Sequence, residues 1–394
     1  MPFADRDAIE PPMEEIRRIA YPGAVDADGH ILEDAGLWER YLEPRYRDRA
    51  MRLARDEQGL EFLEIDGRSS KHVRRGLPAS LGGMLKNVEN VIPSPANTYA
   101  SCAAFGAMDA KERVQRLERE GLDAAFLYPT LGVLWEAECE DVELAQAYTR
   151  AYNRWIADFC RDSGGKLIPI AHLSLGDPAA ASEELVRAVK DGCKGGWVAP
   201  FSITRVPHGH PDHDRLFATA QDLDVPLAIH PSFEPDWAVP HRFEIRGRGK
   251  NFFLNVTAAD AVRHAFTTFF QFATFDRFPR LKLVLLESGA GWIGYWLDRM
   301  DGYCRSLVGI GVALREKPSD YFRRQCWISC DPDETTIPGL VALLGEDRFF
   351  WASDFPHPDH TGDYIAELER LVGDLPETAR TGLLGANVRR LFQV

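Results

Sequence analysis

The sequence has no apolar run near the roughly 20 residues that a membrane-spanning helix needs. Its first residues are acidic and lack the basic and then apolar pattern of a secretory signal peptide. No Cys-x-x-Cys pair occurs among the seven cysteines, and the closest two, Cys326 and Cys330, fall in a strand-like segment. We therefore expect a cytoplasmic protein with free, buried thiols.

Several common signatures are also missing. The chain contains no P-loop, no Gly-x-Gly-x-x-Gly after a strand and no Gly-x-Ser-x-Gly nucleophile motif. Lysine and arginine number 46 against 60 aspartates and glutamates, which gives a net charge of −14 and disfavours nucleic acid and anionic membranes as partners. Hydrophobic residues make up 45% of the 394, which is enough for a large core.

No repeat is visible, but short apolar runs alternate with longer amphipathic stretches. The runs are nearly continuous in apolar character, as in parallel strands buried on both faces. They are Val25–His30, Ala124–Pro129, Leu167–Leu173, Gly195–Phe201, Pro226–Pro231, Lys282–Glu287, Cys326–Asp331 and Phe349–Asp354. The stretches with helical spacing are Asp109–Gly121, Asp141–Asp162, Pro178–Asp191, Asp212–Asp224, Thr257–Arg277, Gly291–Val308, Glu334–Gly345 and Gly362–Gly373. Asp109, Asp177 and Asp212 are predicted helix N-caps.

This alternation predicts an α/β fold of the (β/α)8 TIM barrel type, with a doubly wound open sheet as the alternative from pattern alone. Ile31–Met108 breaks the rhythm and is interpreted as an insertion after the first strand. Phe233–Val256 is a second irregular stretch, and we expect both at the end of the barrel that binds substrate. The predicted organisation is an extension, residues 1–24, followed by one barrel domain, residues 25–394.

Ionisable residues stand where the predicted strands end. They are Asp28 and His30 on the first strand, His230 on the fifth, Glu287 on the sixth, and Asp354 with nearby His357 on the eighth. One such residue is more often a cap or a hydrogen-bonded structural group. Four strand ends that present nitrogen and carboxylate ligands together predict a metal site at the mouth of the barrel.

Further candidates are less specific. His172 ends the third strand and could contact substrate, although a structural role fits equally well. Asp331 ends the seventh strand and could support a metal ligand. His208, His210 and His213 cluster before a helix, and we interpret them as part of a solvated loop.

The strand-end motifs resemble those of the amidohydrolase-related family, which includes metal-dependent decarboxylases of aromatic and muconate-type acids. The resemblance covers about Asp26 to the C-terminus. It is carried by Asp28-Gly-His30, by Leu227–Pro231, by Phe278–Val284 leading to Glu287-Ser-Gly-Ala-Gly-Trp292, by Ala352-Ser-Asp354-Phe-Pro-His357, and by Leu384–Phe392.

Two departures from the family pattern bear on the reaction. Asp28 stands where the family usually has histidine or glutamate, and Glu287 replaces the histidine that usually ends the sixth strand and serves as acid or base. Together with Asp354 and Glu33, these residues enrich the site in carboxylate, which suits a pair of iron or manganese ions. Zinc in a hydrolytic site more often takes a histidine-rich set.

The resemblance is therefore closest to a branch of non-haem dinuclear iron or iron–manganese monooxygenases. It implies two divalent ions and hydroxylation of an unactivated C–H bond in a carboxylic acid or acyl-coenzyme A thioester. His30, Glu287 and Asp354 are the expected catalytic residues, and Glu287 is the expected bridging ligand. Arg246 and Arg248 are expected to meet the anionic substrate.

Two other hypotheses stay open. One is a metal-dependent hydrolase or decarboxylase of an organic acid, with zinc if hydrolytic, in which Glu287 transfers the proton. The other is a non-catalytic barrel subunit, against which the number of ligand-type residues argues. We also expect the chain to form a homo-oligomer, in the simplest case a dimer.

Overall fold

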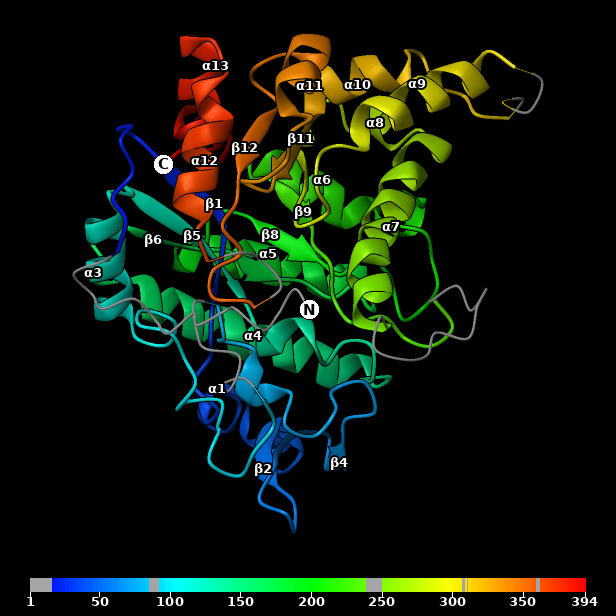
Figure 1. Ribbon diagram of the computed structural model, residues 1–394. Helices are drawn as coiled ribbons and strands as arrows, with labels where there is room; N and C mark the ends of the chain where they lie inside the picture. The colour runs from blue at the N-terminus through cyan, green and yellow to red at the C-terminus, as the bar shows by residue number, and fades with distance from the viewer. Residues whose placement is uncertain (1–15, 85–91, 239–249, 307–308, 310, 359–361) are drawn as a thin grey trace.

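Parallel strands form a closed barrel in the computed structural model, which describes residues 16–84, 92–238, 250–306, 309, 311–358 and 362–394 (Figure 1). The barrel strands are β1 (Val25–Ile31), β5 (Ala124–Pro129), β6 (Leu167–Pro169) continued by β7 (Ala171–His172), β8 (Gly196–Val198), β9 (Leu227–Ile229), β10 (Leu283–Leu285), β11 (Cys326–Cys330) and β12 (Phe349–Trp351). Neighbouring strands pair in parallel along β1–β5–β6 and along β7 to β12. The predicted third strand is interrupted at Ile170.

The last strand returns to the first. The Asp354 amide donates to the Asp28 carbonyl at 3.0 Å, and the His30 amide donates to the Phe355 carbonyl at 2.7 Å. These bonds join β12 to β1, so the predicted TIM barrel is confirmed and the open sheet is excluded.

Alternate side chains of the strands fill the barrel. Phe126, Ile168, Ile170 and Val284 belong to one buried cluster, which also takes in the C-terminal helix. The Phe392 ring of that helix lies 4.6 Å from the Phe126 ring. The interior is therefore a packed core below the mouth, and open chemistry is confined to the carboxyl ends of the strands.

Helices surround the barrel in the alternation that the sequence predicts (Figure 1). They are α3 (Ala110–Glu120), α4 (Val142–Cys160), α5 (Pro178–Asp191), α6 (Asp214–Asp222), α7 (Lys250–Gln271), α8 (Thr274–Arg277), α9 (Ile293–Cys304), α10 (Pro318–Gln325), α11 (Ile337–Leu344), α12 (Tyr364–Gly373), α13 (Glu377–Thr381) and α14 (Asn387–Phe392). The predicted caps Asp109 and Asp177 are confirmed, because each carboxylate accepts two backbone N–H groups of the following turn.

Other helix predictions were wrong in detail. Asp212 is not a cap: it lies in a short 3-10 helix, Pro211–His213, whose cap is His210. The predicted helix Thr257–Arg277 begins earlier, at Lys250, and is divided at Ala273, where φ is +50°. Such a left-handed residue cannot continue a right-handed helix, so the chain starts again as α8.

The insertion after β1 has its own small structure, at the lower end of Figure 1. It contains α1 (Leu37–Tyr41) and an antiparallel sheet of β2 (Arg52–Arg55), β3 (Glu61–Ile65) and β4 (Arg68–Ser69). Its Met84 amide donates to the Pro356 carbonyl at 3.0 Å, and its Lys71 amide donates to Glu138 at 2.8 Å. The insertion thus packs on the loops that follow β12 and β5.

The second irregular stretch differs from the prediction. Its last part, from Lys250, forms the first turns of α7. Residues 239–249, and with them Arg246 and Arg248, lie outside the described residues. Among the helices described, none is both long and apolar enough to cross a membrane.

Candidate metal centre

Asp28 and His30 reach the barrel mouth from the end of β1. The pairing of β1 with β5 shifts between Asp26 and Gly29. A Cβ atom at Gly29 would lie 2.5 Å from Oδ2 of Asp26 and 2.6 Å from Nη2 of Arg113, so any larger residue would force these buried side chains to move. This irregularity leaves Asp28 and His30 together in one group of potential ligands, as strand alternation predicts.

The ring orientations of His30 and His230 are set by the backbone. Nδ1 of His30 lies 2.8 Å from the Pro129 carbonyl, and Nδ1 of His230 lies 2.6 Å from the Pro231 carbonyl. A carbonyl only accepts, so Nδ1 carries a proton in each ring, and Nε2 is the nitrogen that faces the other ligands. The two Nε2 atoms lie 3.2 Å apart. A metal ion bound by both Nε2 atoms is compatible with this short separation.

Glu287, after β10, completes this group, and Asp354, after β12, lies beside His30. Oε2 of Glu287 lies 3.1 Å from Nε2 of His230, and Oδ1 of Asp354 lies 3.1 Å from Nε2 of His30. Both residues have positive φ, +39° and +53°, in the region that non-glycine residues seldom adopt. Such backbone strain concentrates at functional sites, where the surrounding structure holds it in place.

The donor set fits a divalent ion. Nε2 of His30 lies 3.7 Å from Oδ1 of Asp28 and 3.6 Å from Oε2 of Glu287. Ligand atoms about 2.1 Å from one ion are separated by roughly 3.0 to 3.5 Å when they subtend 90 to 110°. The observed separations of 3.1 to 3.7 Å are close to this range. Both carboxylate oxygens of Asp28 are buried and accept no hydrogen bond from any described residue.

Burial dominates the electrostatics of the group. It raises the pKa of Asp28 to about 7, against the attraction of His230 and His30. Burial opposes ionisation of Glu287 as well, but His230 and His30 outweigh it and lower its pKa to about 2. Several carboxylates buried together are costly to ionise, and a bound cation offsets that cost.

His357 extends the group on one side. His30, Glu287, Asp354 and His357 form a second set of potential ligands that overlaps the first. Nδ1 of His357 lies 2.9 Å from Oδ1 of Asp354, and its Nε2 lies 3.0 Å from the Thr130 hydroxyl. The ring also packs on that of His30, with centroids 4.0 Å apart.

Glu33 is not part of either group, so its predicted ligand role needs correction. Its carboxylate accepts hydrogen bonds from the amides of Thr130, Leu131 and Gly132, at 3.1, 2.8 and 2.9 Å. Both oxygens therefore accept hydrogen bonds from the loop after β5. Glu33 thus holds that loop, and with it Thr130, beside His357.

The histidine-rich loop is also different from the prediction. His208 and His213 are buried, and the interpretation as a solvated loop was wrong. The His208 ring pairs with the Ala199 carbonyl at 2.8 Å, and the His213 ring pairs with the His208 carbonyl at 2.9 Å. Both rings therefore form hydrogen bonds within the loop after β8 and hold it in place.

Several residues that support the site were missed. Glu334 binds the amides of Ala290 and Gly291 and thereby shapes the turn after Glu287. Asp331 was predicted to support a ligand. Its backbone amide donates a hydrogen bond to the same Glu334 carboxylate, at 3.0 Å. No local pattern separates Glu334 from an ordinary helix-start glutamate, because Ala290 and Gly291 lie over 40 residues away.

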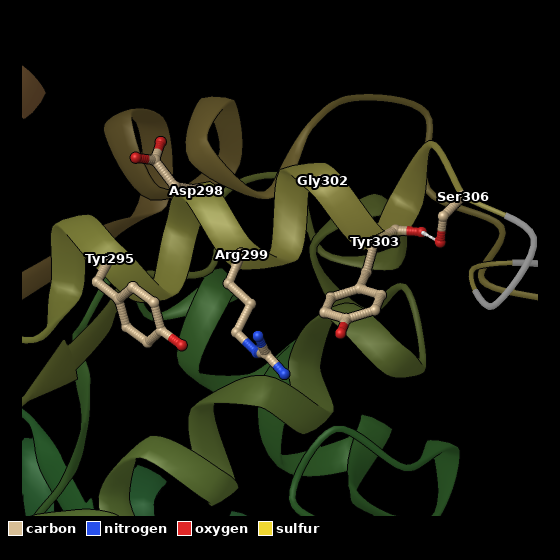
Figure 2. Close-up of a pocket in the computed structure, with 6 residues that line it drawn as sticks. All are labelled: Tyr295, Asp298, Arg299, Gly302, Tyr303 and Ser306. Atoms are coloured by element: carbon tan, nitrogen blue, oxygen red, sulfur yellow. Dashed lines mark hydrogen bonds between the residues drawn. The ribbon is translucent and has the colours of Figure 1, made fainter.

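The hollow found on the surface is not at the strand ends. It has a volume of about 380 Å³ and is lined by Tyr295, Asp298, Arg299, Gly302, Tyr303 and Ser306 (Figure 2). All belong to α9 or directly follow it, and Figure 2 shows the side chains of Tyr295, Arg299 and Tyr303 on one outer face of the helix. None of the strand-end residues lines this hollow.

The chain is similar to a known family and to individual proteins of stated activity. The family described as amidohydrolase matches residues 115–394. A gamma-resorcylate decarboxylase from Rhizobium sp. is 27% identical over 296 residues, which are 72% of this chain and 86% of the relative.

Solved structures agree on the fold. An amidohydrolase from Mycobacterium avium subsp. paratuberculosis superposes with a TM-score of 0.78 at 20% identity, over 94% of this chain and 99% of that one. A 5-carboxyvanillate decarboxylase from Novosphingobium aromaticivorans, with bound manganese and 3-methoxy-4-hydroxy-5-nitrobenzoic acid, superposes with a TM-score of 0.66 at 16% identity, over 96% and 100%.

These relatives overturn the predicted reaction. The expected iron-dependent monooxygenase acting on unactivated C–H bonds was wrong, because the matching relatives of stated activity are decarboxylases. The carboxylate at Glu287, on which that hypothesis depended, is compatible with either chemistry. Oxygen ligands suit manganese as well as iron, so ligand type alone could not decide between them.

Proposed function

This chain belongs to the amidohydrolase family, and we propose that it is a metal-dependent decarboxylase of an aromatic acid. The observation that carries the proposal is the convergence of Asp28, His30, His230 and Glu287 in one set of potential ligands, with Asp354 in a second set that shares His30 and Glu287. The ligand separations suit an ion. Relatives named as decarboxylases, and one solved neighbour with manganese and a nitrobenzoic acid, support the reaction and the ion.

We assign the ion to Asp28, His30 and His230, which belong to one set of potential ligands, and to Asp354, whose Oδ1 lies 3.1 Å from Nε2 of His30. When bound, it would act as a Lewis acid that fixes the anionic substrate and withdraws electron density from it. The backbone carbonyls of Pro129 and Pro231 keep both imidazoles in the ligating tautomer.

Glu287 is assigned the proton transfer. Its side chain keeps 20% of its surface exposed, whereas those of Asp28 and Asp354 keep 1% and 4%. Loss of carbon dioxide breaks the ring–carboxyl bond and leaves its electron pair on the ring carbon. That carbon must then take up a proton. Glu287, which His230 and His30 hold ionised, would first accept a proton from solvent or a substrate hydroxyl and then pass it to the carbon. It is the carboxyl group of the cluster most open to a substrate.

Aromatic side chains beside the ligands favour a flat substrate. The Tyr128 ring stacks on His230 with centroids 5.5 Å apart, and the Trp197 ring lies 5.5 Å from it. Phe201 and Phe233 form a further apolar cluster with Ala199 next to β8. An apolar wall with a few polar groups suits an aromatic acid better than an extended acyl thioester.

A second ion is a separate proposal. The overlapping set of His30, Glu287, Asp354 and His357 supports it. Nε2 of His30 has one lone pair and can serve one ion only, so a second ion would depend on His357 and on bridging by Glu287 or Asp354. Full metal loading of a His357→Ala variant would argue for a single ion.

Two organisational proposals also remain. We retain the division into an extension, residues 1–24, and a single barrel domain, residues 25–394. We also retain a homo-oligomer, which is supported by exposed apolar side chains such as Phe252 and Val256 on α7 and Tyr295 on α9.

Carbon dioxide release tests the function. Manganese-loaded protein should release labelled carbon dioxide from carboxyl-labelled 2,6-dihydroxybenzoate or 5-carboxyvanillate, with and without oxygen. Asp354→Asn is the matched inactive control, because it keeps the shape and removes one ligand charge. Fully loaded protein that releases none from a panel of hydroxybenzoates would refute the proposal.

A further inference from the structure

His172 faces the barrel interior near the metal ligands without belonging to them. Ile168 and Ile170 point into the interior cluster, and strand alternation turns His172 the same way one step nearer the mouth. Its ring stacks on Trp197, its partner in register on β8, with centroids 3.9 Å apart and planes 15° apart. Trp197 in turn contacts His230.

Glu136 decides which nitrogen of His172 carries the proton. Its Oε2 lies 3.0 Å from Nε2 of His172, and its Oε1 accepts from the Ser174 hydroxyl at 2.6 Å. An ionised carboxylate only accepts hydrogen bonds, so Nε2 is the protonated nitrogen. Burial lowers the pKa of His172, which keeps the ring neutral. Nδ1 is therefore a hydrogen-bond acceptor.

This acceptor has no partner within the protein as described. Nδ1 of His172 is buried and meets no hydrogen-bond donor from residues 16–84, 92–238 or the other described ranges. Nε1 of Trp197 and the Tyr128 hydroxyl are likewise buried without a partner among those residues. Buried polar groups are rarely left unpaired. Tyr128 and Trp197 contact His230, and His172 stacks on Trp197, so the three unpaired groups lie close together and indicate a ligand with complementary groups.

We infer that Nδ1 of His172 accepts a hydrogen bond from a ring hydroxyl of the substrate, so that the enzyme selects aromatic acids that carry such a donor. The inference rests on the proposed function for the presence of an aromatic acid. His172 is the specificity residue, and Glu136 is a positioning residue that acts through it. A methyl ether at the same ring position has no proton to donate and leaves Nδ1 unpaired.

A pair of ligands tests the selection directly. Wild-type manganese-loaded protein should bind 2,6-dihydroxybenzoate at least tenfold more tightly than 2,6-dimethoxybenzoate, which has no ring hydroxyl in either orientation, measured by calorimetry. In Glu136→Gln, the amide can donate to Nε2 of His172, so the proton moves to Nδ1 and the acceptor becomes a donor. The preference for the diol should then disappear or reverse.

Ser174→Ala is the matched control. It removes a hydrogen bond from the same carboxylate but leaves Nε2 of His172 facing an acceptor, so the preference should persist. Nitrogen-15 spectra of zinc-loaded protein with labelled histidine give a second signature: His172 should show a bare Nδ1 in the wild type and a protonated Nδ1 in Glu136→Gln.

A second variant covers the case in which Glu136→Gln does not fold. His172→Phe keeps the stack on Trp197 and removes the acceptor, so it should bind the two ligands within about twofold. An unchanged preference in either folded variant, or no preference in the wild type, would overturn the inference. Selective binding without carbon dioxide release would instead refute the decarboxylase proposal and leave the role of His172 standing.

Discussion

Both carboxylate oxygens of Asp26, on β1, accept hydrogen bonds from Ser353, the residue before Asp354. Oδ1 accepts from the Ser353 amide at 3.0 Å, and Oδ2 accepts from its hydroxyl at 2.7 Å. Arg113 lies 3.9 Å from the same carboxylate and donates to the His30 carbonyl at 3.0 Å. The first and last strands are thus joined immediately behind two proposed ligands.

Asp26→Asn should weaken both the fold and the metal site. An amide can accept from only one of the two Ser353 donors and leaves Arg113 without its charge partner. We expect a loss of about 1–3 kcal/mol in the free energy of unfolding and a tenfold to hundredfold loss in metal affinity. Denaturant unfolding and metal titration measure these. Asp222→Asn, at an exposed ion pair, is the control and should change neither.

Gly29→Ala should disrupt the end of β1. Its new Cβ would overlap the Asp26 and Arg113 side chains, both of which are buried and cannot withdraw freely. We expect a lower melting temperature and reduced metal content. Gly302→Ala on α9 is the matched control, since nothing lies within 4 Å of its Cβ position, and it should be neutral or slightly stabilising. Equal behaviour of the two variants would contradict this account.

His230→Ala and Asp354→Ala should each lose most bound metal and still fold. The barrel core lies below the mouth, so removal of a ligand leaves its packing in place. Metal analysis and circular dichroism measure the two properties, and His210→Ala, on a loop after β8, is the control. Stoichiometric metal in Asp354→Ala would show that the ligand assignment is wrong.

Glu287→Gln separates proton transfer from ligation. The amide keeps the size of the side chain and removes the acid. If Glu287 transfers the proton, metal content should persist while carbon dioxide release falls by roughly 100-fold or more. Loss of a metal ion from this variant would make Glu287 a ligand and would return the proton transfer to another group.

The free energy of unfolding should decrease as the pH falls, because His208 is buried. Burial lowers its pKa from 6.5 to about 4, with a smaller contribution from His213. The unfolded chain therefore binds more protons between these values, so stability is present above pH 6.5 and is lost as the pH falls toward 4. The loss should be of the order of 3 kcal/mol. His208→Gln keeps a hydrogen-bond donor for the Ala199 carbonyl but cannot be protonated in this range. The free energy of unfolding of this variant should therefore depend less on pH.

The local sequence pattern was sufficient to predict the strands and helices and the face of the strand on which the candidate ligands lie. Continuous apolar runs mark parallel strands buried on both faces, and β5 and α5 have the predicted bounds. Alternation along a strand places Asp28 and His30 on one face, and the carboxyl ends of all barrel strands share one mouth. The sequence by itself therefore determined the barrel and the residues that converge there.

Only the tertiary structure decided what each polar side chain does. Glu33 and Glu334 look like ligands or surface charges in the sequence, but backbone amides about 100 and 44 residues away take up their carboxylates. The role of His172 likewise depends on Glu136, which comes from a loop that the strand pattern does not describe. The physical reason is that periodicity reports burial and facing, which are local, whereas a hydrogen bond depends on which distant donor the folded chain brings within about 3 Å.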